Sequence, residues 1–287
     1  MSGGTPLQPA DLILHSGRLW DGGDLEGQDA VAVGGGRIVA TGTDNEVERH
    51  RSDHTRLVDV GGRRIMPGLI DSHLHMVRAG LRWNEDVRWH DVGSLAKGLD
   101  DIARAAEGRD PGRWIAVLGG WHPHQFTEGR PPSRGELDEV APNHPVFVQR
   151  NYIEAFLNTR ALEETGWADG DMPAWPIALQ TLREKLPAPH FEARVRGTET
   201  MLRDLNRLGL TGCIDAGGFG MDPDAYRPIT ELYERGEHGF RARLLVGAAR
   251  PGTETAQLED WMSRVSPGSG GDFLRYLGAG EVLLFGA

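Results

Sequence analysis

Short apolar runs alternate with amphipathic segments along most of this chain, and this alternation constrains its fold more than any other feature. The β-like runs lie at 114–118, 145–148, 212–215 and 241–246, and the helix-like segments lie at 94–107, 134–140, 190–208, 224–235 and 253–265. Strands separated by helices are typical of a parallel sheet with helical crossovers. A chain of 287 residues is long enough to bury a large core. We therefore predict an α/β fold.

The first 66 residues have a different pattern. They contain short β-like runs at 12–14, 30–33, 37–40 and 57–60, joined by glycine-containing turns. Gly34, Gly35 and Gly36 form the most pronounced of these turns, and we predict a hairpin there. A phosphate-binding loop is the alternative, but no helix and no Gly-Lys-Ser/Thr motif follow. We expect a small β-sandwich module at 1–66 and a second domain at 67–287.

Charge and composition exclude several classes of partner. A formal net charge of −11 argues against nucleic acid or an anionic membrane as the main partner. No apolar run approaches the roughly 18 residues that a membrane span needs, and the start of the chain lacks the pattern of a signal peptide. Cys213 is the single cysteine, so neither an intrachain disulfide nor a Cys-x-x-Cys zinc site can form. We expect a cytoplasmic protein that acts on a small molecule, and homo-oligomerisation stays open.

His73 and His75 follow a Pro67-Gly68 bend and the apolar pair Leu69-Ile70, which we expect to enter the core. Side chains two residues apart on a strand point to the same face. Two imidazoles on one face, at the end of an apolar run, are a pair of ligands for one metal ion. The alternative is two ordinary buried histidines.

The residues around this pair resemble the amidohydrolase superfamily, and in particular its amidohydrolase-3 branch, which includes N-substituted formamide deformylases and relatives of D-aminoacylases. The resemblance is carried by the segments 10–19, 36–40, 66–75, 119–121, 131–138, 145–148 and 158–162. It implies a TIM-like (β/α) barrel with a divalent metal, which we expect to be zinc, at the carboxyl ends of its strands. The metal would activate a water that attacks an amide-type C–N carbonyl. His73 and His75 would be the ligands from the first strand.

The chain departs from the family pattern after this first strand. The family completes its site with a carboxylate or carbamylated lysine near the middle strand, two later histidines and a late aspartate. His144 and His238 precede β-like runs and His190 opens a helix, so the later histidine ligands are not visible. Glu281 lies in a segment similar to the family's middle strand, and we predict that it is the third metal ligand. The alternative is an exposed residue at the start of a strand at 282–285.

A barrel usually needs about 250 residues, and fewer than that follow His75. We therefore expect both domains to be incomplete, as in the N-terminal part of a longer hydrolase.

Five further residues are candidates for the substrate site. We predict that Trp121, His122, His124 and Asp215 line the substrate pocket, and that Asp71 orients a ligand histidine from behind. Each has an alternative: a core position for Trp121, a surface loop or a second metal site for the two histidines, a helix cap or loop role for Asp215, and a turn cap for Asp71.

The first hypothesis for function is a metal-dependent amidohydrolase. The alternative is a catalytically incomplete fragment or binding module that needs a complementary chain. A nucleotide-binding α/β protein is a third hypothesis, but no glycine-rich phosphate motif follows a strand. We expect the isolated chain to bind zinc weakly and to be inactive.

Overall fold

The computed structural model describes residues 7–23, 25–151, 153–168, 173, 177–218, 220–236, 239–281 and 283. The chain divides into two compact units, Met1–Leu69 and Ile70–Ala287. This division lies close to the domain boundary that we propose from the sequence. Among the described residues, no helix is long and apolar enough to cross a membrane.

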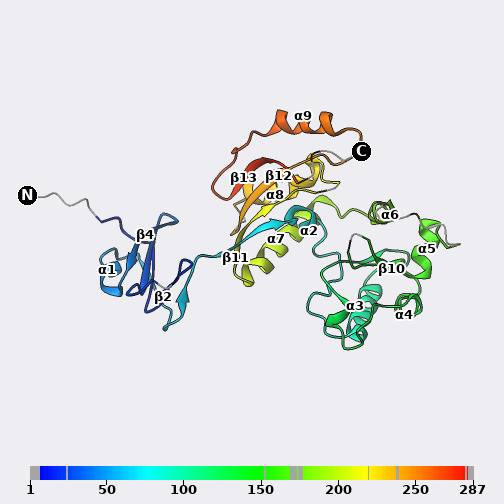
Figure 1. The fold of residues 1–287 in the computed structure, drawn as a ribbon, viewed down its shortest axis with the longest axis horizontal. Coiled ribbons are helices and arrows are strands. Elements are labelled where there is room, and N and C mark those ends of the chain that lie inside the picture. The colour runs from blue at the N-terminus through cyan, green and yellow to red at the C-terminus, as the bar shows by residue number, and fades with distance from the viewer. Residues whose placement is uncertain are drawn as a thin grey trace, which may run out of the picture. The chain divides into compact units, whose positions relative to one another are not determined.

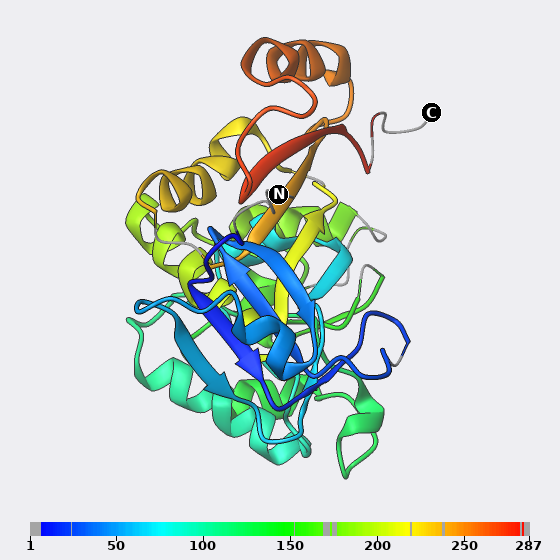
Figure 2. The same ribbon diagram turned by 90° about the vertical axis from the view of Figure 1, so that its left-hand side faces the viewer.

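The first unit contains two small sheets (Figure 2). The larger has the order β4-β3-β1-β5, and the smaller pairs β2 with β6. The strands are β1 (Leu12–His15), β2 (Arg18–Leu19), β3 (Ala30–Gly34), β4 (Arg37–Gly42), β5 (Arg56–Asp59) and β6 (Arg64–Ile65), and the one short helix between them is α1 (Asp44–Glu48). The predicted glycine hairpin is confirmed, because β3 and β4 pair antiparallel. Gly35 and Gly36 both have positive φ values, which glycine adopts at little cost.

The second unit is built around a four-stranded sheet with the order β13-β12-β11-β7 (Figure 1). Its strands are β7 (Leu69–Leu74), β11 (Leu210–Asp215), β12 (Arg241–Val246) and β13 (Leu274–Ala279), and its helices are α2 (Met76–Gly80), α7 (Phe191–Arg207), α8 (Pro223–Glu234) and α9 (Glu254–Arg264). β12 pairs parallel with both β11 and β13. The predicted α/β fold with helical crossovers is confirmed. The sheet is open, since the described strands form no closed ring.

Two details of this sheet differ from the sequence prediction. Of the strand predicted at 282–285, only Leu283 lies within the described residues, and the last described strand ends earlier, at Ala279. Glu281 therefore follows β13, and the alternative that it begins a strand at 282–285 lies outside the described residues. Leu69 and Ile70, which we expect to enter the core, are exposed and not buried; they lie at the start of β7, an edge strand of this sheet.

A second sheet, with the order β10-β9-β8, is inserted between α2 and α7. Its strands are β8 (Ile115–Leu118), β9 (Val146–Gln149) and β10 (Ala155–Leu157), and its helices are α3 (Leu95–Glu107), η1 (Pro123–Gln125), α4 (Arg134–Val140), α5 (Thr159–Thr165) and α6 (Ile177–Lys185). Residues that alternate along these strands pack into two different hydrophobic clusters. Ile115 and Val117 belong to the cluster with Trp89, whereas Ala116 and Phe147 belong to the cluster with Leu182. A sheet buried on both faces reads as a continuous apolar run, as these strands do.

Asn158 joins three parts of this inserted region. Its side chain is fully buried. The Oδ1 atom accepts hydrogen bonds from the N–H groups of Val146 (2.8 Å) and Ala161 (2.9 Å). The Nδ2 group donates to the carbonyls of His144 (2.8 Å) and Ala141 (3.4 Å). Asn158 therefore caps α5 and fixes that helix to the start of β9.

We expect Asn158→Ala to lower the free energy of unfolding by about 2–4 kcal/mol, because four buried backbone groups lose this partner. Urea unfolding measures the change. Ser133→Ala is the matched control: Ser133 also caps a helix through its side chain, but at the surface, and its loss should cost about 1 kcal/mol. Equal losses in the two variants would contradict the role given to Asn158.

Candidate metal centre

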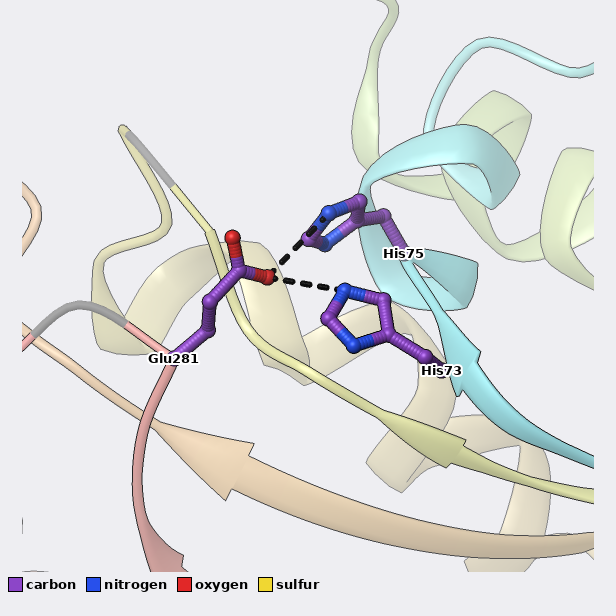
Figure 3. Close-up of side chains that lie close together, drawn as sticks. All are labelled: His73, His75 and Glu281. Carbon is purple, nitrogen blue, oxygen red and sulfur yellow. Dashed lines mark ion pairs between the residues drawn. The ribbon is translucent and has the colours of Figure 1, made fainter.

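Three candidate ligands meet at the carboxyl ends of the strands of the four-stranded sheet. β7 ends at Leu74, and His75 is the N-cap residue of α2, so His73 and His75 lie at the carboxyl end of this strand. Glu281 follows the carboxyl end of β13, which lies at the other side of the same sheet. Figure 3 shows the two imidazoles and the carboxylate pointing toward one another.

The distances between the donor atoms suit a single metal ion. The Oε2 atom of Glu281 lies 3.1 Å from Nε2 of His73 and 3.4 Å from Nε2 of His75. The three donor atoms all lie within 4.8 Å of one another. Zinc bonds of about 2.0–2.1 Å in a tetrahedral arrangement place neighbouring donor atoms roughly 3.3 Å apart. Two imidazole nitrogens and one carboxylate oxygen are also a donor set that zinc favours.

The site is open to solvent. The exposed fraction of the side chain is 61% for His73, 24% for His75 and 35% for Glu281. Catalytic zinc sites keep three protein ligands and leave one position for water or substrate. The observed arrangement therefore matches an open site better than a closed structural one.

The tautomer of His75 follows from its hydrogen bond. Its Nδ1 atom lies 2.8 Å from the carbonyl oxygen of Gly217. A carbonyl can only accept, so Nδ1 carries a hydrogen, and in the neutral imidazole Nε2 keeps its lone pair for a metal. The Nε2 atom is the one that faces Glu281. Backbone carbonyls commonly orient metal-bound histidines in this way.

The turn after β11 binds the segments that carry the ligands. The N–H of Ala216 donates to the carbonyl of Leu74 (3.1 Å), and the N–H of Glu281 donates to the carbonyl of Ala216 (2.8 Å). The N–H of Gly280 donates to the carbonyl of Val246 at the end of β12 (3.0 Å). This turn therefore links the end of β7 to the segment after β13.

Asp215 is fully buried, and this does not fit the predicted contact with substrate. Its Oδ2 accepts from the N–H of Val77 (2.7 Å) and its Oδ1 from the N–H of Gly217 (2.8 Å). Burial raises the pKa of this carboxyl group, and the two N–H bonds and the nearby His75 and Arg78 oppose that rise. Asp215 thus binds the first turn of α2 from the end of β11.

Asp71 lies on β7, and its Oδ1 accepts a hydrogen bond from the backbone N–H of His73 (2.9 Å). The carboxylate thus fixes the backbone of the strand next to the first candidate ligand. This contact corresponds to the turn-cap alternative. The prediction that Asp71 orients a histidine ring remains a prediction.

The structure places the remaining candidates in the inserted region. Trp121 is buried, its Nε1 donates to the carbonyl of Gln149 (2.9 Å), and its ring stacks on Phe126, so it is a core residue. His122 caps η1 and His124 lies on it; both are exposed, with ring centroids 4.6 Å apart. In the described part of the chain, the group of three or more donors that could hold a metal is His73, His75 and Glu281. The substrate role of His122 and His124 stays a prediction.

Sequence reasoning did not find the backbone contributions of Val77, Ala216 and Gly217. The run Asp215-Ala216-Gly217-Gly218 at the end of an apolar strand is the signal that could have found those of Ala216 and Gly217. Cys213 is a free, buried cysteine, and burial raises the pKa of its thiol to about 12.

An α/β fold with an open His-His-carboxylate site at the carboxyl ends of its strands is typical of metal-dependent hydrolases. Sequence comparison agrees, because the family model described as "Amidohydrolase family" matches residues 56–284. The chain belongs to the amidohydrolase family.

Relatives and solved structures agree with this assignment. The chain is 36% identical to the N-substituted formamide deformylase of Arthrobacter pascens over 139 residues, which are 48% of this chain and 26% of that protein. It is 30% identical to the putative amidohydrolase YtcJ of Bacillus subtilis over 265 residues, which cover 79% of this chain and 48% of the relative. An uncharacterized metal-dependent hydrolase from Pyrococcus furiosus has the same fold, with a TM-score of 0.61 and 19% identity over 93% of this chain and 55% of that one. The chain thus spans half or less of the length of these curated relatives.

Proposed function

We propose that this chain is a metal-dependent amidohydrolase module. It binds one divalent ion, with zinc as the first candidate, through His73, His75 and Glu281. The observation that carries this proposal is that three donor atoms converge, with the two imidazole nitrogens 3.1 and 3.4 Å from the same oxygen of Glu281. When bound, the metal would supply an activated water and polarise a carbonyl group.

The chain's own residues would prepare the site for that chemistry. Gly217 holds His75 with its Nε2 lone pair directed to the site. The Glu281 carboxylate offsets the charge of a divalent ion. The exposure of His73 leaves access for a small-molecule substrate. We propose hydrolysis of non-peptide, amide-type C–N bonds, supported by the names of the relatives, one a formamide deformylase and one a putative amidohydrolase.

We also propose that the four-stranded sheet belongs to a TIM-like (β/α) barrel. Its strands pair in the order in which they occur along the chain, β12 runs parallel to both neighbours, and helices connect them. The candidate ligands lie at the carboxyl ends of the strands, where barrel enzymes build their sites. We further propose that residues 1–66 form a β-sandwich module and that residues 67–287 form the barrel domain. We also propose a cytoplasmic location.

The alternative of a catalytically incomplete module has its own support. The described residues bring three donors together, whereas the family resemblance implies two further histidines and a late aspartate. We therefore propose that residues 1–287 by themselves bind metal but need a complementary chain for turnover.

Removal of a ligand tests the metal site. We expect His73→Ala and Glu281→Gln each to weaken zinc binding by more than about 100-fold, since loss of a direct ligand should exceed the effect of losing its supporting contacts. Competition with a chromophoric chelator measures the affinity. His54→Ala is the control, because it removes an exposed histidine of the first unit, and its affinity should stay within about twofold of wild type. Unchanged zinc binding in both ligand variants would refute the proposed site.

An activity assay separates the two forms of the proposal. We expect the purified chain, loaded with zinc, to show no turnover of N-formyl or N-acyl compounds above the metal-free background. The reason is that the three ligands do not include the residue that transfers a proton in the family's reaction. Metal-dependent turnover that is lost in Glu281→Gln would contradict the incomplete-module alternative and establish a working hydrolase.

A further inference from the structure

Asp215 is a buried carboxyl group with a specific pair of partners. A carboxylate removed from water is costly unless hydrogen bonds compensate. The 2.7 Å and 2.8 Å bonds from the N–H groups of Val77 and Gly217 are as short as bonds to charged acceptors usually are. They also join two segments that are far apart in the sequence, the first turn of α2 and the turn after β11.

Both partners of Asp215 lead directly to the candidate ligands. Val77 lies two positions after His75, so its bond fixes the start of α2 next to that ligand. Gly217 uses its N–H on Asp215 and its carbonyl on Nδ1 of His75. Between them, Ala216 accepts the backbone N–H of Glu281 at 2.8 Å. One side chain thus braces the turn that contacts two of the three candidate ligands.

The turn lies close to the ligand segments, and its backbone conformation favours glycine. Gly217 has φ +78°, and a Cβ atom there would lie 3.0 Å from the carbonyl oxygen of Gly280 and 3.1 Å from that of Leu245. Gly218 has φ +132°, and a Cβ atom there would lie 3.3 Å from Nδ1 of His75. Two glycines in conformations that other residues rarely adopt place this backbone against the ligand segments.

We propose that Asp215 is a positioning residue of the metal centre, which fixes the 215–217 turn so that the Gly217 carbonyl holds His75 as its Nδ1–H tautomer and the Ala216 carbonyl holds Glu281. This inference rests on the proposed metal site. A carboxylate suits the role because it accepts from two N–H groups at once, whereas an asparagine would turn its NH2 group toward one of them.

Asp215→Asn tests the proposal, with Asp138→Asn as its matched control. Asp138 also accepts two hydrogen bonds, from the N–H and the hydroxyl of Thr159 (both 2.8 Å), but it does so in the inserted region. In the metal-free full chain, ¹H–¹⁵N NMR of the histidine rings reports the tautomer of His75. We expect the Nδ1–H form in wild type and in Asp138→Asn, and a mixture of tautomers in Asp215→Asn. Zinc affinity should fall about 10–100-fold in Asp215→Asn alone.

Each outcome decides the proposal. A folded Asp215→Asn chain with the wild-type tautomer and zinc affinity within twofold of wild type would overturn it. If that variant does not fold, the tautomer in wild type decides: the Nδ1–H form supports the inference, and the Nε2–H form overturns it. Failure of the proposed function is distinguishable, because wild type would then bind no zinc while the tautomer measurement still reports on Asp215 and His75.

Discussion

The turn after β11 is the contact on which the candidate site depends. The segment with His73 and His75 lies at the end of β7 and the segment with Glu281 follows β13, and these are the two outer strands of a four-stranded sheet. Their side chains meet because the turn after β11 binds both segments through its backbone. The parallel pairing of β12 with β11 and β13 brings the carboxyl ends of these strands to one edge. A shift of one ångström in the turn would remove the spacing that a single ion requires, since metal–ligand distances tolerate only about 0.2 Å.

The sequence predicts the local structure well wherever a local signal exists. Helix α3 begins after Ser94 and helix α5 after Asn158, each with the side chain of the cap residue accepting an N–H from the first turn. The strands of the inserted sheet are continuous apolar runs, so they are also predictable. β13 was missed because its residues are partly exposed and include Gly278, which weakens the apolar pattern of a buried strand.

The environment of a charged side chain is harder to predict than the element that carries it. The sequence places Asp215 at the end of a strand, but one of its hydrogen-bond partners, Val77, belongs to another segment of the chain. A substrate contact and a structural brace therefore look alike in the sequence. The same holds for Trp121, whose packing against Phe126 and bond to Gln149 assign it to the core. His73, His75 and Glu281 could be grouped in advance only through the family resemblance.

Family membership and geometry support one another in this protein. The family match at 56–284 includes all three candidate ligands, and the fold agrees with a metal-dependent hydrolase over 93% of the chain. The central claim is that these three side chains hold one metal ion. X-ray absorption spectroscopy of the zinc-loaded chain tests it most directly. The account predicts only nitrogen and oxygen neighbours at about 2.0–2.2 Å, with the scattering pattern of two imidazoles. A sulfur neighbour at about 2.3 Å, or a spectrum without imidazole, would contradict it.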